Sequence, residues 1–102
     1  MFEHNGKQYE LKFNTERMKL IEATSKKSLM GEWSSSNGMF SLQTIETCFQ
    51  FTLKEAGADT FVPQGEAIRI CSEHMTEKGY ATVALEIQEA MQVNMPFLFQ
   101  AN

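Results

Sequence analysis

The sequence has few of the residues that build nucleotide, metal or covalent-catalysis sites. It holds two cysteines, two histidines and, in Asp59, a single aspartate. Its six glycines never stand at the spacing of a phosphate-binding loop or a dinucleotide fingerprint, and no Gly-x-Ser-x-Gly segment occurs. We therefore expect neither an enzyme nor a cofactor.

Two cysteines and two histidines would suffice for one tetrahedral zinc ion only if all four came together. Cys71 and His74 are three residues apart on a predicted helix and share a face. Cys48 lies within a different predicted helix and His4 beside a turn, without the short ligand loops of zinc knuckles. We expect Cys71 to fill the core, His74 to lie at its boundary, and no metal to bind.

Long apolar runs and positive charge are also scarce. No run of about 18 apolar residues exists, and the first residues lack the basic start and apolar stretch of a secretion signal. Nine basic side chains stand against thirteen acidic ones, and residues 55–102 carry only Arg69 and Lys78 as cations. Such a chain is poorly suited to nucleic acid or anionic membranes. We expect neither as a partner, and we expect the protein in the cytoplasm.

Residues 1–13 predict a β-hairpin. Asn5-Gly6 is the favoured pair for a two-residue type I′ turn, because both central positions need positive φ. This turn fixes three cross-strand pairs: His4 with Lys7, Glu3 with Gln8, and Phe2 with Tyr9. Alternation along the strands then places four apolar side chains on one face: Phe2, Tyr9, Leu11 and Phe13.

Four helices are predicted after the hairpin, from apolar spacing and end signals, over residues 14–26, 42–56, 63–79 and 81–94. In the helix predicted over residues 42–56, Leu42 is the first of the apolar side chains that we expect to face the core. Residues 31–40 are rich in serine and glycine and are typical of a flexible loop. The fold class is therefore mainly α (α+β), with one domain over residues 1–102. It comprises a hairpin at 1–13, a helical body at 14–96 and an apolar tail at 97–102.

Apolar side chains near loops and near the tail are the candidate partner-binding residues. Trp33, inside the Ser-rich segment, is either an anchor on the core or an exposed contact residue. The tail must fold back on the helices or be covered by another chain, so a homo-oligomer is one possible outcome. Seven methionines suit adaptable apolar surfaces. The candidates are Trp33, Met95, Phe97, Leu98 and Phe99.

The opening segment resembles that of a known group of proteins. It reads Phe2-Glu3-His4-Asn5-Gly6-Lys7-Gln8-Tyr9-Glu10-Leu11-Lys12-Phe13-Asn14 and leads into a helix. The small tail assembly chaperones of long-tailed bacteriophages, particularly in phages and prophages of Gram-positive hosts, often open in this way. The similarity covers about the first twenty residues, and the remainder agrees in length, acidity and helical pattern.

This resemblance implies a non-catalytic role in the cytoplasm of the bacterial host. Members of the family bind the long, apolar, helical tape measure protein before the tail tube polymerises around it. They also help to recruit tail tube subunits and are absent from the mature virion. The alternative is another small acidic phage or bacterial adaptor or inhibitor that acts by protein–protein binding.

Overall fold

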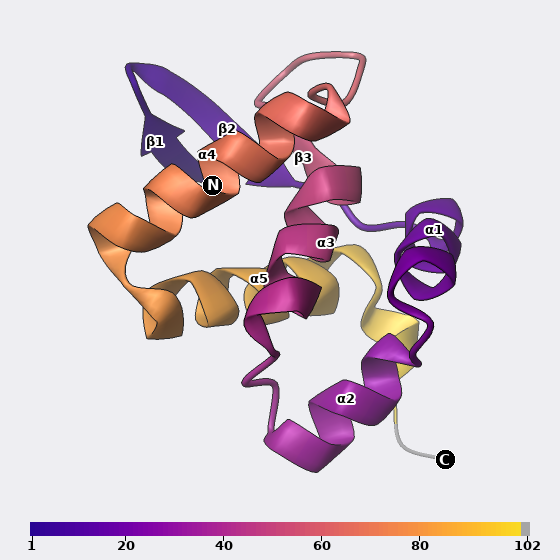
Figure 1. Ribbon diagram of the computed structural model, residues 1–102. Coiled ribbons are helices and arrows are strands. Elements are labelled where there is room, and N and C mark those ends of the chain that lie inside the picture. Colours follow the sequence, from indigo (N-terminus) through magenta and orange to yellow (C-terminus); the bar gives the residue numbers. More distant parts are fainter. Residues whose placement is uncertain (101–102) are drawn as a thin grey trace.

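A computed structural model describes residues 1–100 of the chain and shows a three-stranded sheet packed against helices (Figure 1). In chain order the elements are β1 (Phe2–His4), β2 (Lys7–Leu11), α1 (Thr15–Ser25), α2 (Leu29–Ser36), α3 (Leu42–Thr52), β3 (Leu53–Glu55), α4 (Gln64–Lys78), α5 (Tyr80–Asn94) and the 3₁₀ helix η1 (Pro96–Phe99). The expected class, a mainly helical α+β domain that opens with a hairpin, is confirmed.

The hairpin forms with the predicted register. Phe2 pairs with Tyr9, Glu3 with Gln8 and His4 with Lys7. The turn residues Asn5 and Gly6 have φ values of 50° and 79°, as a type I′ turn requires. All four apolar residues of the predicted inner face are buried: Phe2, Tyr9, Leu11 and Phe13. His4 is buried beside them, at 7% exposure.

The third strand was not predicted and corrects the expected helix over 42–56. The helix α3 ends at Thr52, and Leu53 turns to extended geometry at φ −72° and ψ 130°. β3 then pairs antiparallel with β2, with Leu11 opposite Leu53. The pairing satisfies backbone groups of β2 that a continued helix would have left open. Leu42, expected on the inner stripe, is 62% exposed, while α3 itself occupies the middle of the fold (Figure 1).

In place of the expected flexible loop over 31–40, residues 29–36 form the helix α2. Ser28 caps its start, accepting the backbone N–H of Gly31 at 3.0 Å. Asn37, in the left-handed conformation, ends it, and the N–H of Gly38 donates to the Trp33 carbonyl at 3.0 Å. Caps at both ends offset the low helix propensity of the serine residues. The structure therefore has five α-helices in residues 1–100, where four were predicted.

The last two α-helices meet at a corner, where α4 packs on α3 and passes beside the hairpin before α5 begins (Figure 1). α4 and α5 are joined at Gly79, whose φ of 92° lets the chain reverse between them. The Tyr80 hydroxyl donates to the Phe40 carbonyl at 2.6 Å and ties the start of α5 to the segment before α3. Met95 ends α5, and Pro96 begins η1. Residues 101 and 102 of the predicted apolar tail lie outside the described residues.

Candidate functional site

The candidate partner-binding residues lie mostly in one region, where α2 meets η1. The Trp33 ring lies 4.9 Å from the Phe99 ring, centroid to centroid, and 5.7 Å from that of Phe40 in an edge-on arrangement. Trp33, Leu98 and Phe99 are half-buried against the core. Trp33 thus anchors α2 while keeping part of its ring accessible.

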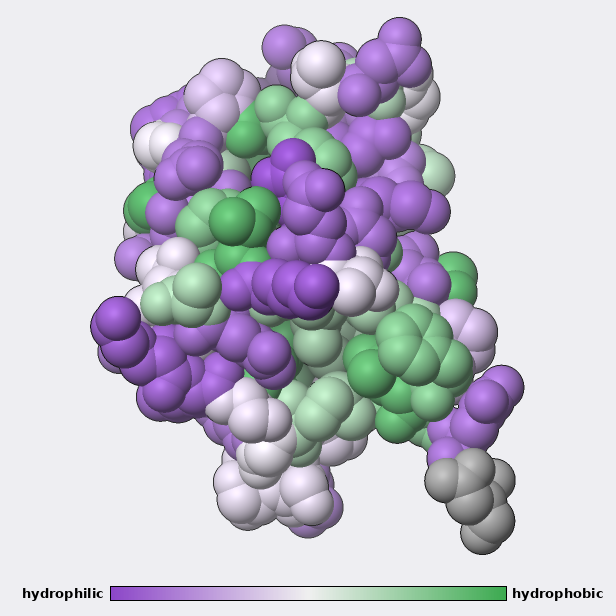
Figure 2. Space-filling view, turned by 90° about the vertical axis from the view of Figure 1, so that its right-hand side faces the viewer, coloured by the Kyte–Doolittle hydropathy of each residue, from purple (hydrophilic) through white to green (hydrophobic). Residues whose placement is uncertain are grey.

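Phe97 differs from its neighbours because it is 58% exposed. It stands in η1 between residues held in place on either side, since the Leu98 N–H donates to the Met95 carbonyl at 3.1 Å. We call Trp33, Phe97, Leu98 and Phe99 the C-terminal apolar surface. Figure 2 shows apolar side chains gathered beside the grey terminal residues on this side of the molecule.

Met95, also a candidate, does not belong to this surface. Its side chain is 3% exposed and packs in the core. Met95 ends α5, and its carbonyl accepts the Leu98 N–H, so its buried side chain fixes the position of η1 and of the apolar surface. Met95 therefore lies in the core, unlike the other four candidates, and its contact with a partner stays a prediction.

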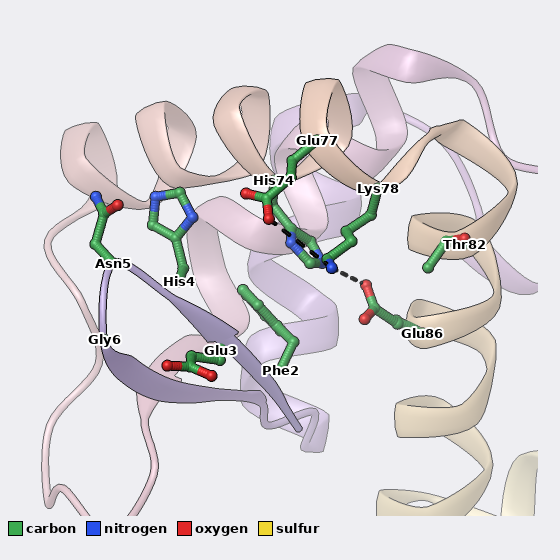
Figure 3. A pocket seen from close by; sticks show the side chains of 10 residues that line it. All are labelled: Phe2, Glu3, His4, Asn5, Gly6, His74, Glu77, Lys78, Thr82 and Glu86. Atoms are coloured by element: carbon green, nitrogen blue, oxygen red, sulfur yellow. Dashed lines mark hydrogen bonds and ion pairs between the residues drawn. The ribbon is translucent and has the colours of Figure 1, made fainter.

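A second region, a groove between β1 and the α4–α5 corner, was not predicted. It has a volume of about 540 Å³ and is lined by residues of three segments: Phe2, Glu3, His4, Asn5 and Gly6 from the hairpin, His74, Glu77 and Lys78 from α4, and Thr82 and Glu86 from α5. Figure 3 shows α4 passing along one side of the hairpin and α5 descending from the end of α4. Sequence reasoning missed this groove because its walls lie about 70 residues apart along the chain.

Two buried histidines hold the hairpin to the helical wall of the groove. The Nε2 atom of His4 lies 2.8 Å from a Glu73 carboxylate oxygen, and Nε2 of His74 lies 2.7 Å from Glu86. The His74 ring also stacks on Phe2, with centroids 4.0 Å apart. His74, expected at the boundary of the core, is only 1% exposed, and its Nδ1 has no hydrogen-bond partner among the described residues.

Glu73, an acidic residue beside this wall, has a pKa that is changed by hydrogen bonds to its carboxylate. The hydrogen bond from His4, followed by that from Arg69, lowers the pKa of Glu73 below its usual value. The Arg69 guanidinium lies 3.1 Å from the Glu73 carboxylate, one helical turn away on α4. Glu73 therefore stays ionised and positions the ring of His4. The sequence did contain a signal for the burial of His4, because strand alternation puts His4 on the same face of the hairpin as Phe2.

The cysteines are not placed as a catalytic or metal-binding set. Both thiols are buried, as expected for Cys71. Burial raises the pKa of Cys71 to about 12 and that of Cys48 still further, so both stay protonated at neutral pH. Within residues 1–100, no three side chains of histidine, cysteine, aspartate or glutamate gather as a metal-ion site would require.

Comparison with known proteins identifies no relative of this chain. Searches against protein-family models, curated proteins and solved structures find no match for this chain. Among the described residues, every helix is too short or too polar to cross a bilayer.

Proposed function

We propose that this protein is a tail assembly chaperone of the long-tailed bacteriophage type. It would act in the host cytoplasm by binding an apolar helical stretch of the tape measure protein, without catalysing a reaction. Recruitment of tail tube subunits belongs to the same proposal and rests on the resemblance alone. The observation that carries the proposal is the C-terminal apolar surface, where Phe97 is 58% exposed.

The chemistry of this surface suits an apolar helix. Aromatic rings form its base, because the Trp33 and Phe99 rings lie 4.9 Å apart, centroid to centroid, and both side chains are only partly buried. A client helix presents apolar side chains at spacings of three and four residues, and such a stripe can cover Phe97 and the rings beside it. Aromatic side chains with few rotatable bonds lose little entropy on binding.

The surface is also held in shape before any client arrives. Met95 is anchored in the core, and η1 follows it directly with a hydrogen bond from Leu98. Trp33 is carried on a helix capped at both ends. A preformed surface avoids the cost of ordering a loop, which supports binding through η1 and α2.

The test is coexpression with a phage tape measure protein, with solubility of the client and copurification as readouts. Phe97→Ser removes the most exposed ring of the surface and should weaken capture about tenfold, since burying the exposed part of a Phe contributes about 1–2 kcal/mol. Leu85→Ser is the matched control, because Leu85 on α5 is also 58% exposed and lies outside this surface.

Three outcomes separate the possibilities. Loss of capture with Phe97→Ser and retention with Leu85→Ser supports the proposed surface. Equal loss or equal retention with both variants would refute the proposed surface, because capture would then not depend on Phe97 in particular. If the unaltered protein neither binds nor solubilises any tape measure protein, the chaperone role is excluded, and the adaptor or inhibitor alternative takes its place.

A further inference from the structure

The sheet ends in an open edge that borders the groove. Its strand order is β1-β2-β3, so β1 has a partner strand on one side only. None of the ten residues that line the groove belongs to β2. The groove therefore runs along the edge of β1 that faces away from β2, where a further strand could be added.

The backbone of Glu3 points toward this groove. The Gln8 carbonyl accepts the N–H of Ala56 at 2.8 Å, so Gln8 directs its backbone groups toward β3. Glu3 is the residue opposite Gln8 in the hairpin. Glu3 and Gln8 are therefore a pair that does not exchange hydrogen bonds, and in such a pair the N–H and C=O groups of the two residues point away from each other. The N–H and C=O of Glu3 are thus directed away from β2 and available to an added strand.

The groove continues past Phe2 and Glu86 into a second hollow of about 400 Å³ between the strands and α5. Five acidic side chains line the two together: Glu3, Glu10, Glu77, Glu86 and Glu89. Glu86 is bonded to His74 and Glu77 lies 3.8 Å from Lys78, whereas no ion pair involves Glu3, Glu10 or Glu89 among the described residues. Lys78 is the one lysine or arginine in the lining. Apolar residues appear at the far end, where Met1 is 81% exposed and Val93 is 71% exposed.

We propose that this edge and its groove bind an extended, positively charged segment of a partner protein, which adds to β1 as a fourth strand. The backbone of Glu3 supplies pairing, and the carboxylates of both groove walls select lysine or arginine side chains. An apolar residue of the segment contacts Met1 and Val93 at the far end. The inference goes beyond the chaperone role and does not depend on it, because it uses none of the residues of the C-terminal apolar surface.

The strand edge is fixed in place before binding. Phe2 stacks on His74, and His4 is bonded to Glu73, so both ends of β1 are held to α4. Neighbouring strands lie about 4.8 Å apart, so an added strand enters the space beside β1. The pairing surface is short, since β1 has three residues, and we therefore expect weak, salt-sensitive binding.

The test titrates isotope-labelled protein with a capped hexapeptide of alternating lysine and valine, followed by NMR. Amide shifts should concentrate at β1 and at the α4–α5 corner, including Glu3, Asn5 and Thr82. A glutamate–valine hexapeptide should bind about tenfold more weakly or not at all. A lysine–valine peptide methylated on alternate backbone nitrogens keeps its charge but cannot pair, and it should also lose about tenfold.

Variants of the protein locate the site. Glu3→Lys should weaken binding of the lysine–valine peptide about tenfold. Glu16→Lys, an equal change of charge at an exposed carboxylate on α1 outside both hollows, should leave binding unchanged apart from a small, salt-screened effect.

Several results would overturn the proposal. Equal affinity for the methylated peptide would mean that charge alone drives binding and that no strand is added. Equal affinity for the glutamate–valine peptide would refute the selection for positive charge. The absence of shifts at millimolar peptide, or equal losses with Glu3→Lys and Glu16→Lys, would refute the site itself.

Discussion

Glu32, the neighbour of Trp33 on α2, should be one of the most important polar residues for stability. One carboxylate oxygen accepts the Ser41 N–H at 2.7 Å, and the other accepts the Thr44 hydroxyl at 2.7 Å. Lys27 lies 3.7 Å away. These contacts join α2 to the first turn of α3, where unpaired N–H groups favour a negative charge.

The expected loss follows from these contacts. The Glu32 side chain is only 14% exposed, so water replaces its partners poorly. Glu32→Gln keeps the shape but removes the charge and one acceptor oxygen. Since a hydrogen bond to a charged group contributes about 1.5–3 kcal/mol, we expect this change to lower the free energy of unfolding by about 1.5 kcal/mol. That corresponds to roughly 6–12 °C in Tm for a domain of this size.

The effect should depend on pH in a defined direction. Burial by itself would raise the pKa of Glu32, but the hydrogen bonds from Ser41 and Thr44, with Lys27 nearby, lower it below its usual value of 4.5. A carboxyl group with a lowered pKa in the folded state stabilises the fold above its unfolded pKa. That contribution is lost as the pH falls through the folded pKa. The difference between the unaltered protein and Glu32→Gln should therefore shrink in acid.

Urea denaturation followed by circular dichroism measures both effects, at pH 7 and at a pH well below 4. Glu46→Gln, an exposed carboxylate on α3, is the matched control and should change stability by less than about 0.5 kcal/mol. A loss at pH 7 no larger than that of the control would refute the role of Glu32. A loss that stays constant into acid would refute the argument from its charge.

Two further predictions concern the backbone and the thiols. Gly38→Ala should cost about 2 kcal/mol, because φ is +79° and the added Cβ, 2.6 Å from Nε2 of Gln88, would push that side chain off its hydrogen bond with the Gly38 carbonyl. Gly57→Ala has a similar φ of +83° with no atom within 4 Å, so it should cost only about 1 kcal/mol, and equal losses in urea denaturation would contradict the steric argument. Cys48 and Cys71 should not react with Ellman's reagent in the folded protein, since burial raises the pKa of both thiols, and both should react in guanidinium chloride. Rapid labelling of the folded protein would show that the thiols are accessible.

The hairpin could be predicted in full because its determinants are local. Asn5-Gly6 selects the turn, the turn sets the register, and alternation sets the buried face. The same reasoning could have placed His4 in the core, since it shares a face with Phe2. The helices α1, α4 and α5 also lie close to their predicted bounds, because each has a clear apolar period and a marked end.

The secondary-structure predictions were wrong in the middle of the chain, where tertiary contacts override the local conformational preference of the residues. Leu53 continues the helical apolar pattern of α3, yet the unpaired edge of β2 converts it to a strand. In α2, composition favoured a loop, while the caps Ser28 and Asn37 and the packing of Trp33 favour a helix. The Asn37-Gly38 pair after this segment was the available sign of a helix end.

The two proposed surfaces share the helix α5 and come close together at its end. Thr82 and Glu86, near the start of α5, line the groove, whereas Val93, at the far end of the proposed strand site, lies just before η1. α5 has 15 residues, so its ends lie roughly 22 Å apart, and only the Val93 end of the strand site is near Phe97. Neighbouring contacts are not independent. We therefore expect a helical client on η1 to change the affinity for the apolar end of an extended segment, while the contacts of that segment with Glu3 and Thr82 remain unchanged.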